Sequence, residues 1–288
     1  MINLDQETKF IMKKYNLMAN KKLGQNFLID ENTVEQILNV ANIKKEDLII
    51  EIGPGLGTLT NKIIQKAGKV IAIELDDRMI SILEERFNKY NNIQIIHEDI
   101  LKVDLRKLIK TEKESSNIKS VKIVANLPYY ITTPIIMKLL EEKLDIETIT
   151  VMIQKEVADR LTEIPGKKLS GAITYSVYYY AEAEKVLNVP KSSFIPEPQV
   201  ESEVIRLTLR ESPPVRVIDE KRFFNIIKLA FMQRRKTLAN ALSSSNLFKS
   251  KDEIYEVLNN LKINAKVRGE ALTIEQFAQI ENYIDSKN

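Results

Sequence analysis

The chain of 288 residues contains no cysteine and a single histidine, His97. The absence of cysteine excludes disulfides, thiolate nucleophiles and cysteine-bound zinc, and it fits a cytoplasmic protein. One histidine is too few for a multi-histidine metal site and argues against a histidine-centred triad, so we expect no metal. His97 follows a strand-like run and is expected to be structural.

Long apolar runs are also missing. Lys13 and Lys14 near the amino terminus are not followed by an apolar stretch, and no run is long enough to cross a membrane. We therefore expect a soluble protein that does not engage a membrane. The formal net charge is only +3, so any basic surface for nucleic acid must be local.

From Asp47 onward, apolar runs alternate with segments of helical spacing. The strand-like runs are Leu48–Ile52, Val70–Ile73, Ile93–Ile96, Val121–Ala125 and Ile149–Ile153. The helical patterns lie at 58–67, 77–90, 104–110 and 133–143, and the polar segment Thr111–Ser120 indicates a surface loop. Alternating strands and helices predict a parallel sheet with right-handed crossovers.

After residue 154 the order changes. The apolar runs that follow a short helix and a loop are Ile173–Tyr180, Lys185–Val189 and Val200–Leu209. No helix separates the last two, so the sheet is expected to end in an antiparallel hairpin. Beyond Pro213 and Pro214 the pattern is helical only, at Lys221–Leu242, Lys251–Leu261 and Thr273–Ile284.

These patterns predict three segments. Residues 1–30 form a basic arm and covering segment, of which little can be buried. Residues 31–212 form an α/β domain, and residues 213–288 form a small helical domain. Thr273 and Gln276 have the spacing of a capping box for the last helix, and Asp30 or Asn32 is expected to cap the helix that follows it.

The most informative stretch is Asn126-Leu127-Pro128-Tyr129, which follows the run Val121–Ala125. A proline after a buried strand ends the ladder and turns the chain. Asn126 and the carbonyl of Leu127 are therefore expected at the carboxyl edge, where open α/β sheets bind ligands. Two oxygen acceptors beside the ring of Tyr129 suit a planar base with an exocyclic amino group. The alternative is an asparagine cap beside a core tyrosine.

A glycine loop and two acidic residues follow the first three strands. Gly53 and Gly55 precede a helix, where the backbone can approach a ligand closely. The third glycine of a dinucleotide fingerprint is missing, which weakens a nicotinamide-dependent dehydrogenase. Glu74 ends the second strand, where a carboxylate can bind ribose hydroxyls, and Asp99 follows the third. Together they predict a nucleoside-shaped cleft, although each acid alone could merely cap a helix.

A local basic excess lies in the predicted helical domain. Nine basic and only two acidic residues occur between Val215 and Lys251. Contact with phosphates is the natural use of such a surface. A solvated helix face is the alternative.

The chain resembles the bacterial small-subunit rRNA adenine N6-dimethyltransferases of the KsgA type. The motifs that carry this resemblance, in the order of the family, are Leu23–Leu28, Glu51–Thr60, Asn126–Tyr129, Phe194–Ser202, Phe231–Leu238 and Arg268–Leu272. They cover nearly the whole chain after the arm. The Gly166–Gly171 loop is shorter than expected for the family, and Tyr130 stands where a second aromatic residue is common.

The resemblance implies a Rossmann-like class I methyltransferase sheet, mostly parallel, with a small C-terminal all-helical domain. It implies an enzyme that uses S-adenosylmethionine to dimethylate N6 of two adjacent adenosines. Those adenosines lie in the 3′-terminal hairpin loop of 16S rRNA, in the immature small ribosomal subunit, so the protein would act in ribosome biogenesis. We expect a monomer.

The resemblance also implies three sets of site residues, with the target adenine between Tyr129 and Phe194. The catalytic set is Asn126, Leu127, Pro128, Tyr129 and Phe194. The cofactor-binding set is Asn26, Leu28, Gly53, Gly55, Glu74, Asp99 and Asn126. The RNA-binding set is Arg222, Lys228, Arg234, Arg235 and Lys236.

Two alternatives stay open beside this one. A methyltransferase of large-subunit rRNA that gives antibiotic resistance would share the fold and the Asn126–Tyr129 turn, but the Phe231–Leu238 and Arg268–Leu272 segments argue against it. A non-catalytic assembly factor would bind RNA only, and the intact turn together with Glu74 favours catalysis.

Overall fold

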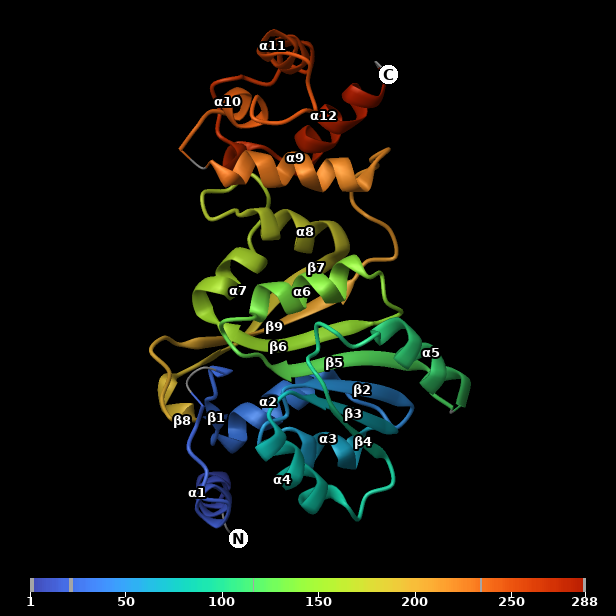
Figure 1. Ribbon diagram of the computed structural model, residues 1–288, viewed down its shortest axis with the longest axis vertical. Coiled ribbons are helices and arrows are strands. Elements are labelled where there is room, and N and C mark those ends of the chain that lie inside the picture. Colours follow the sequence, from blue (N-terminus) through green and yellow to red (C-terminus); the bar gives the residue numbers. More distant parts are fainter. Residues whose placement is uncertain (1–2, 21–22, 116, 234, 287–288) are drawn as a thin grey trace. The chain divides into compact units, whose positions relative to one another are not determined.

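The computed structural model describes residues 3–20, 23–115, 117–233 and 235–286. The chain divides into two compact units (Figure 1). The first contains residues 1–158 and 183–209, and the second contains residues 159–182 and 210–288. The chain passes from the first unit to the second for the last time between Leu209 and Arg210, near the boundary expected at Pro213. The second unit also takes in residues 159–182, which the sequence assigned to the α/β domain.

Seven of the described strands form a mixed sheet in the order β4-β3-β2-β5-β6-β9-β7. They are β2 (Asp47–Ile52), β3 (Lys69–Glu74), β4 (Ile93–His97), β5 (Ser120–Asn126), β6 (Thr148–Gln154), β7 (Ala181–Val189) and β9 (Ser202–Leu209). Strands β2 to β6 pair in parallel, and β9 pairs antiparallel with β6, with Val151 opposite Ile205. The predicted parallel sheet with an antiparallel end is confirmed.

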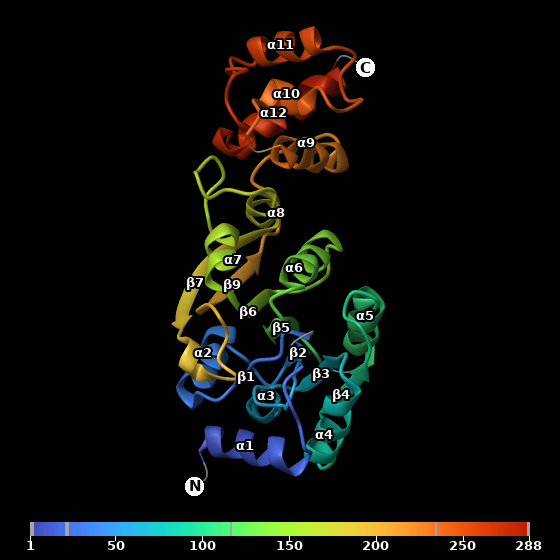
Figure 2. The same ribbon diagram turned by 60° about the vertical axis from the view of Figure 1, so that its left-hand side comes forward.

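The order of the strands creates a switch point between β2 and β5. The chain runs outward from β2 to β3 and β4, then returns to β5 and continues in the other direction to β6. Right-handed crossovers therefore place α3 (Thr60–Lys66) and α4 (Asp77–Phe87) on one face. They place α5 (Leu105–Ser115) and α6 (Thr132–Glu141) on the other (Figure 2). Ligands of such sheets bind beyond the carboxyl ends of the strands at this point.

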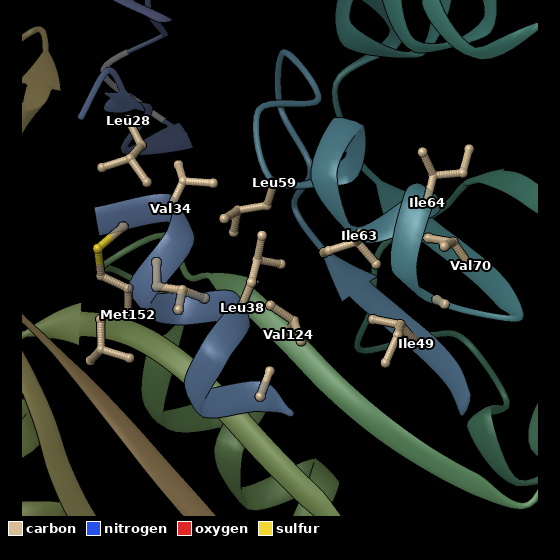
Figure 3. Packing of buried hydrophobic residues seen from close by; sticks show 14 of the residues in the cluster. Leu28, Val34, Leu38, Ile49, Leu59, Ile63, Ile64, Val70, Val124 and Met152 are labelled. Atoms are coloured by element: carbon tan, nitrogen blue, oxygen red, sulfur yellow. The ribbon is translucent and has the colours of Figure 1, made fainter. Parts of the chain in front are cut away.

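Alternate side chains of the central strands pack against helices on each face. On one face, Leu38 of α2 (Glu31–Ala41) and Ile63 of α3 lie over Ile49 and Val124 of the sheet (Figure 3). All four side chains are at most 1% exposed. Helix α2 begins as predicted, because the Asp30 side chain accepts a hydrogen bond from the backbone of Asn32 at 3.1 Å.

The amino-terminal segment contains a helix, α1 (Leu4–Lys14). Its Ile11 is buried in a cluster with Phe27, Leu56, Met79 and Ile82. Of the described residues 3–20, only Thr8 and Ile11 are buried, so the helix is attached to the first unit through few side chains. The apolar partners of Ile11 lie far away in sequence, so local composition did not reveal them.

Helix α5 continues to Ser115, where the sequence predicted a loop from Thr111. The polar composition is that of a surface helix anchored by two buried residues, Leu105 and Ile109. Its exposed side carries an ion pair between Lys110 and Glu114, one helical turn apart, which supports the extension.

The run Ile173–Tyr180 was expected to be a strand, but it lies within helix α8 (Ala172–Tyr180). Tyr175 and Tyr179, four residues apart, are both buried against residues of the second unit. Tyr175 makes an edge contact with Phe277 and donates to the carbonyl of Leu272 at 2.5 Å. This packing overrides the strand propensity of the aromatic run, and it explains why the second unit includes residues 159–182.

The rest of the second unit is helical in its described part, as predicted. Its helices are α9 (Glu220–Met232), α10 (Leu238–Leu242), α11 (Lys251–Asn260) and α12 (Ile274–Ser286). The single helix expected over Lys221–Leu242 is two, because α9 ends at Met232 and Thr237 caps α10. The capping box at Thr273 and Gln276 is confirmed by two reciprocal hydrogen bonds of 3.0 and 3.3 Å.

The remaining described elements are short. They are β1 (Phe27–Leu28) paired with β8 (Phe194–Ile195), α7 (Lys155–Leu161), and the 3₁₀ turns Lys191–Ser193 and Gly269–Ala271. The β1–β8 pair joins the covering segment before α2 to the loop that precedes β9. It brings residues from both ends of the first unit to the carboxyl edge of the sheet.

Candidate active site

A cavity in the first unit lies at the switch point between β2 and β5, at the carboxyl edge where the sequence predicted a ligand site. It is lined by four segments, which are the covering segment Leu23–Leu28, the end of β2 with the loop after it, the end of β3 at Glu74 and Leu75, and the corner after β5. Asn126, Leu127, Pro128 and Tyr129 all line it. Because Gly53 and Gly55 line the same space, the corner and the glycine loop face one connected site.

The corner after β5 presents the asparagine to this cavity. The Asn126 Nδ2 donates to the carbonyl of Asn26 at 3.3 Å, which leaves Oδ1 outside that bond. The backbone N–H of Leu127 donates to the carbonyl of Met152 at 3.1 Å, so the ladder with β6 continues for one residue. Pro128 then ends it, as the sequence predicted.

The two tyrosines after this proline have different surroundings. The hydroxyl of Tyr129 lies 2.7 Å from Oγ of Ser202, at the start of β9, and this hydrogen bond fixes the ring beside the cavity. Burial raises the pKa of Tyr129 above its ordinary value, so the phenol is neutral. Tyr130 also lines the cavity, but it is 55% exposed, at the rim.

The glycine loop depends on left-handed backbone angles. Gly55 has φ +57° and Gly57 has φ +81°. A Cβ on Gly57 would lie 2.6 Å from the ring of Phe87, so no other residue fits there without moving α4. The loop is tied to the next strand by the N–H of Gly55, which donates to Glu74 Oε2 at 3.0 Å.

Glu74 ends β3 with its carboxylate at the edge of the cavity. Its Oε1 accepts from the backbone N–H groups of Leu75 and Asp76 at 2.8 and 2.9 Å. Burial raises the pKa of Glu74, while these donors and Gly55 favour the anion. The side chain is only 8% exposed and rigidly held, as a group that binds ribose hydroxyls requires.

Several residues of this site were not predicted. Gln25 lines the cavity and donates to Asp76 Oδ2 at 2.8 Å, and Asp76 is paired with Arg78 at 2.5 Å. The guanidinium of Arg78 lowers the pKa of Asp76 below its usual range. This network holds the covering segment against the start of α4. The only signal in the sequence is the position of Asp76 as a helix cap, which is common for structural reasons.

Two predicted residues do not line the cavity. Phe194 is 1% exposed and belongs to the core beside Leu28, so it offers no face to a base here. Asp99 lies beyond β4 at the same edge, where Glu98 N–H donates to the carbonyl of Glu74. Its Oδ1 accepts from the backbone of Leu101 at 3.0 Å. The predicted roles of Phe194 in stacking and of Asp99 in cofactor binding therefore stay predictions.

The predicted RNA-binding residues of the second unit differ in their surroundings. Lys228, Arg235 and Lys236 are exposed, and Arg234 lies outside the described residues. The guanidinium of Arg222 pairs with the fully buried carboxylate of Glu281 at 2.5 Å. Its predicted contact with phosphate stays a prediction, and such a contact would compete with this ion pair, since leaving a buried carboxylate unpaired is costly.

The described residues contain neither a metal-binding cluster nor a membrane-spanning helix. None of them form a cluster of three or more acidic, histidine or cysteine side chains suited to a metal ion. Over the same residues, no helix is both long enough and apolar enough to span a bilayer.

Comparison with known proteins decides the family. The profile described as "Ribosomal RNA adenine dimethylase" matches residues 16–286. The chain belongs to the ribosomal RNA adenine dimethylase family. It is 48% identical to "Ribosomal RNA small subunit methyltransferase A" of Alkaliphilus oremlandii (strain OhILAs), over 99% of both chains. The protein of that name from Clostridioides difficile (strain 630) is also 48% identical, over 97% of this chain and 96% of the relative.

Solved structures support the same family and fold. A dimethyladenosine transferase from Plasmodium falciparum matches with a TM-score of 0.75 and 28% identity, over 91% of this chain and 98% of that one. The 23S rRNA methyltransferase ErmE matches with a TM-score of 0.66 at 24% identity, over 90% and 100% of the two chains. At that identity the second match shows the fold alone.

The residues present fit S-adenosylmethionine, the cofactor of this family. The ligand carries a positively charged sulfonium, and the described residues that line the cavity include two carboxyl groups and no lysine, arginine or histidine. Glu74 lines the cavity, which is compatible with its predicted contact with the ribose, and Gly53 and Gly55 leave room for close approach of a ligand. Asn26, Leu28 and Asn126 line the same space. Their predicted contacts with the cofactor are therefore compatible with the geometry.

Proposed function

We propose that this dimethylase-family protein transfers two methyl groups to N6 of each of two adjacent adenosines in the 3′-terminal hairpin loop of 16S rRNA. The observation that supports this most is the single cavity shared by Asn126, Leu127, Gly53 and Glu74. It joins acceptors for an exocyclic amine to groups suited to a nucleoside cofactor. The relatives named for the small ribosomal subunit point to the same RNA.

The corner residues act on the amino group of the adenine. The N6 lone pair is delocalised into the ring, so the amine is a poor nucleophile. The Asn126 Oδ1 and the Leu127 carbonyl accept hydrogen bonds from the two N6–H groups. These hydrogen bonds favour a pyramidal nitrogen and stabilise the positive charge that develops on it. When bound, the cofactor supplies an electrophilic methyl group. The Asn126 side chain is oriented for this task by its bond to Asn26.

The remaining steps need no further ionisable residue. The ring of Tyr129, held by Ser202, provides a stacking surface for the adenine. The methylated nitrogen is acidic enough to lose its proton to water, so no dedicated base is required. The target base must leave the RNA stack to reach the corner, and a loop nucleotide does this at lower cost than a paired one.

One assay tests the proposed function. Purified protein is incubated with labelled S-adenosylmethionine and under-methylated small subunits, and the modified nucleotides are mapped. We expect label on N6 of two neighbouring adenosines of 16S rRNA. Label in large-subunit RNA, or binding of the particle without any transfer, would contradict the proposal. Because the proposed substrate is the small ribosomal subunit, we expect the protein to act in the cytoplasm, where subunits are assembled, and we expect it to act as a monomer.

We further propose that Lys228, Arg234, Arg235 and Lys236 contact phosphates. A plot of log K for RNA binding against log salt concentration falls with a steepness set by the number of phosphate contacts, because each contact releases counterions. Replacing Arg235 and Lys236 together with alanine is expected to reduce the magnitude of this slope by about 1 to 2. Filter binding at several salt concentrations measures this slope. The control replaces Lys107 and Lys110, exposed on α5 of the first unit. Equal slopes for both double variants would exclude the surface around Arg235.

A further inference from the structure

A second carboxyl group lies under the glycine loop, outside the set of residues assigned above. Glu51 is the penultimate residue of β2 and is 1% exposed, yet it lines the cavity. Its Oε2 accepts a hydrogen bond from Oγ1 of Thr60 at 2.6 Å. Thr60 begins α3 and is itself fully buried. The protonation of a carboxyl group held this way, at the wall of a ligand site, depends on the charge of the ligand that binds there.

The electrostatic surroundings of Glu51 are set by burial and by a second acid. Glu74 lines the same cavity and is 8% exposed. Burial, followed by the field of Glu74, raises the pKa of Glu51 to about 8, although the hydrogen bond from Thr60 opposes this. Glu51 is therefore mostly neutral at pH 7 when no ligand is bound.

The other charges on the elements around Glu51 are paired or lie away from it. Lys69 begins β3, at the end of that strand opposite to Glu74, and its partner in β2 is Leu48. The neighbours of Glu51 in the sheet are Ala72 and Val124, which carry no charge. On the adjoining helices and strands, Lys62 of α3 pairs with Glu31 and Glu35. The remaining pairs are Lys122 with Asp47, at the opposite end of β5 and β2, and Arg78 with Asp76 beyond β3. No described cation lines the cavity to stabilise a Glu51 anion.

We propose that Glu51 releases its proton to solvent when S-adenosylmethionine binds and takes a proton back once the methyl group has been transferred and the neutral product remains. The cofactor carries a sulfonium and an ammonium against one carboxylate, so its net charge is +1. The product has lost the sulfonium charge and is neutral overall. A carboxyl group that ionises only beside a cation therefore helps the site to favour the cofactor over the product. This inference rests on the cofactor of the family and not on which adenosine is methylated.

Isothermal titration calorimetry of the full chain tests the proposal without RNA. Titrations at pH 7 in two buffers with different heats of ionisation report the protons released on binding. With a pKa of about 8, wild type is expected to release about 0.9 proton more than Glu51→Gln. The variant corrects for titration of the amine of the cofactor. The difference in proton release between wild type and Glu51→Gln is expected to be small for S-adenosylhomocysteine. It is also expected to be small at pH 9, where Glu51 is already ionised.

Thr60→Val is the matched variant, because it keeps the carboxyl group and removes the donor that favours the anion. For wild type, we expect cofactor affinity to rise with pH relative to Glu51→Gln and to level off near pH 8. In Thr60→Val this plateau is expected at higher pH. In infrared difference spectra of wild type, cofactor binding is expected to remove a protonated carboxyl band. Equal proton release in wild type and Glu51→Gln, an unmoved plateau in Thr60→Val, or an unchanged carboxyl band would each overturn the proposal.

Discussion

Replacing Asn126 with alanine is expected to lower the rate of methyl transfer by about 10²- to 10³-fold, while the protein still binds S-adenosylmethionine. The lost Oδ1 is one of two fixed acceptors for the adenine amine, and removal of one oriented group that stabilises developing charge has an effect of this size. Cofactor binding persists because Glu74 and the Gly53–Gly57 backbone remain in the cavity. Single-turnover rates and calorimetric affinities separate the two effects.

Asn126→Asp is the companion variant. It keeps an oxygen acceptor but loses the Nδ2 donor to the carbonyl of Asn26, so its rate is expected to lie between those of wild type and Asn126→Ala. An alanine variant with the turnover of wild type would remove the corner from the mechanism. An alanine variant that no longer binds the cofactor would show that Asn126 acts on the ligand instead.

Replacing Lys122 with methionine is expected to lower the free energy of unfolding by about 3–5 kcal/mol. Lys122 on β5 and Asp47 on β2 form an ion pair of 2.7 Å, and their side chains are only 2% and 1% exposed. Lys122 also donates to the carbonyl of Asn42 at 2.8 Å. The substitution leaves the carboxylate of Asp47 buried without its cation. Urea denaturation monitored by circular dichroism measures the loss.

The control for this prediction is the double variant Lys122→Met with Asp47→Asn. Asparagine keeps an oxygen that can accept from the backbone N–H of Lys44, a bond of 2.8 Å in the structure, but carries no charge. The double variant is expected to recover most of the stability lost by Lys122→Met. A single variant that loses less than about 1 kcal/mol would show that water or a local rearrangement replaces the lysine.

The parts of the site at strand ends were predictable from the sequence. The runs that became β2, β3 and β5 are almost continuously apolar, as both faces of a parallel sheet are covered. Parallel strands end at one edge, so Gly53, Glu74 and Asn126 had to lie near one another. The cavity that all three line confirms this part of the prediction.

Two of the differences from expectation concern residues whose surroundings come from distant parts of the chain. The aromatic run in α8 has the composition of a strand, but Tyr175 packs on Phe277, more than a hundred positions away. Arg222 belongs to a basic segment, yet it pairs with Glu281 on the last helix. Local composition cannot distinguish an exposed cation from one that neutralises a buried carboxylate.

The sequence by itself determined the family motifs, the parallel sheet and the edge at which ligands bind, because strand periodicity and a proline after a buried strand are local properties. Only the tertiary structure decided that Phe194 is in the core, that Arg222 is paired, and that Glu51 is buried at the wall of the cavity. The physical reason is that burial, and the charge state that follows from it, depends on every element packed around a residue.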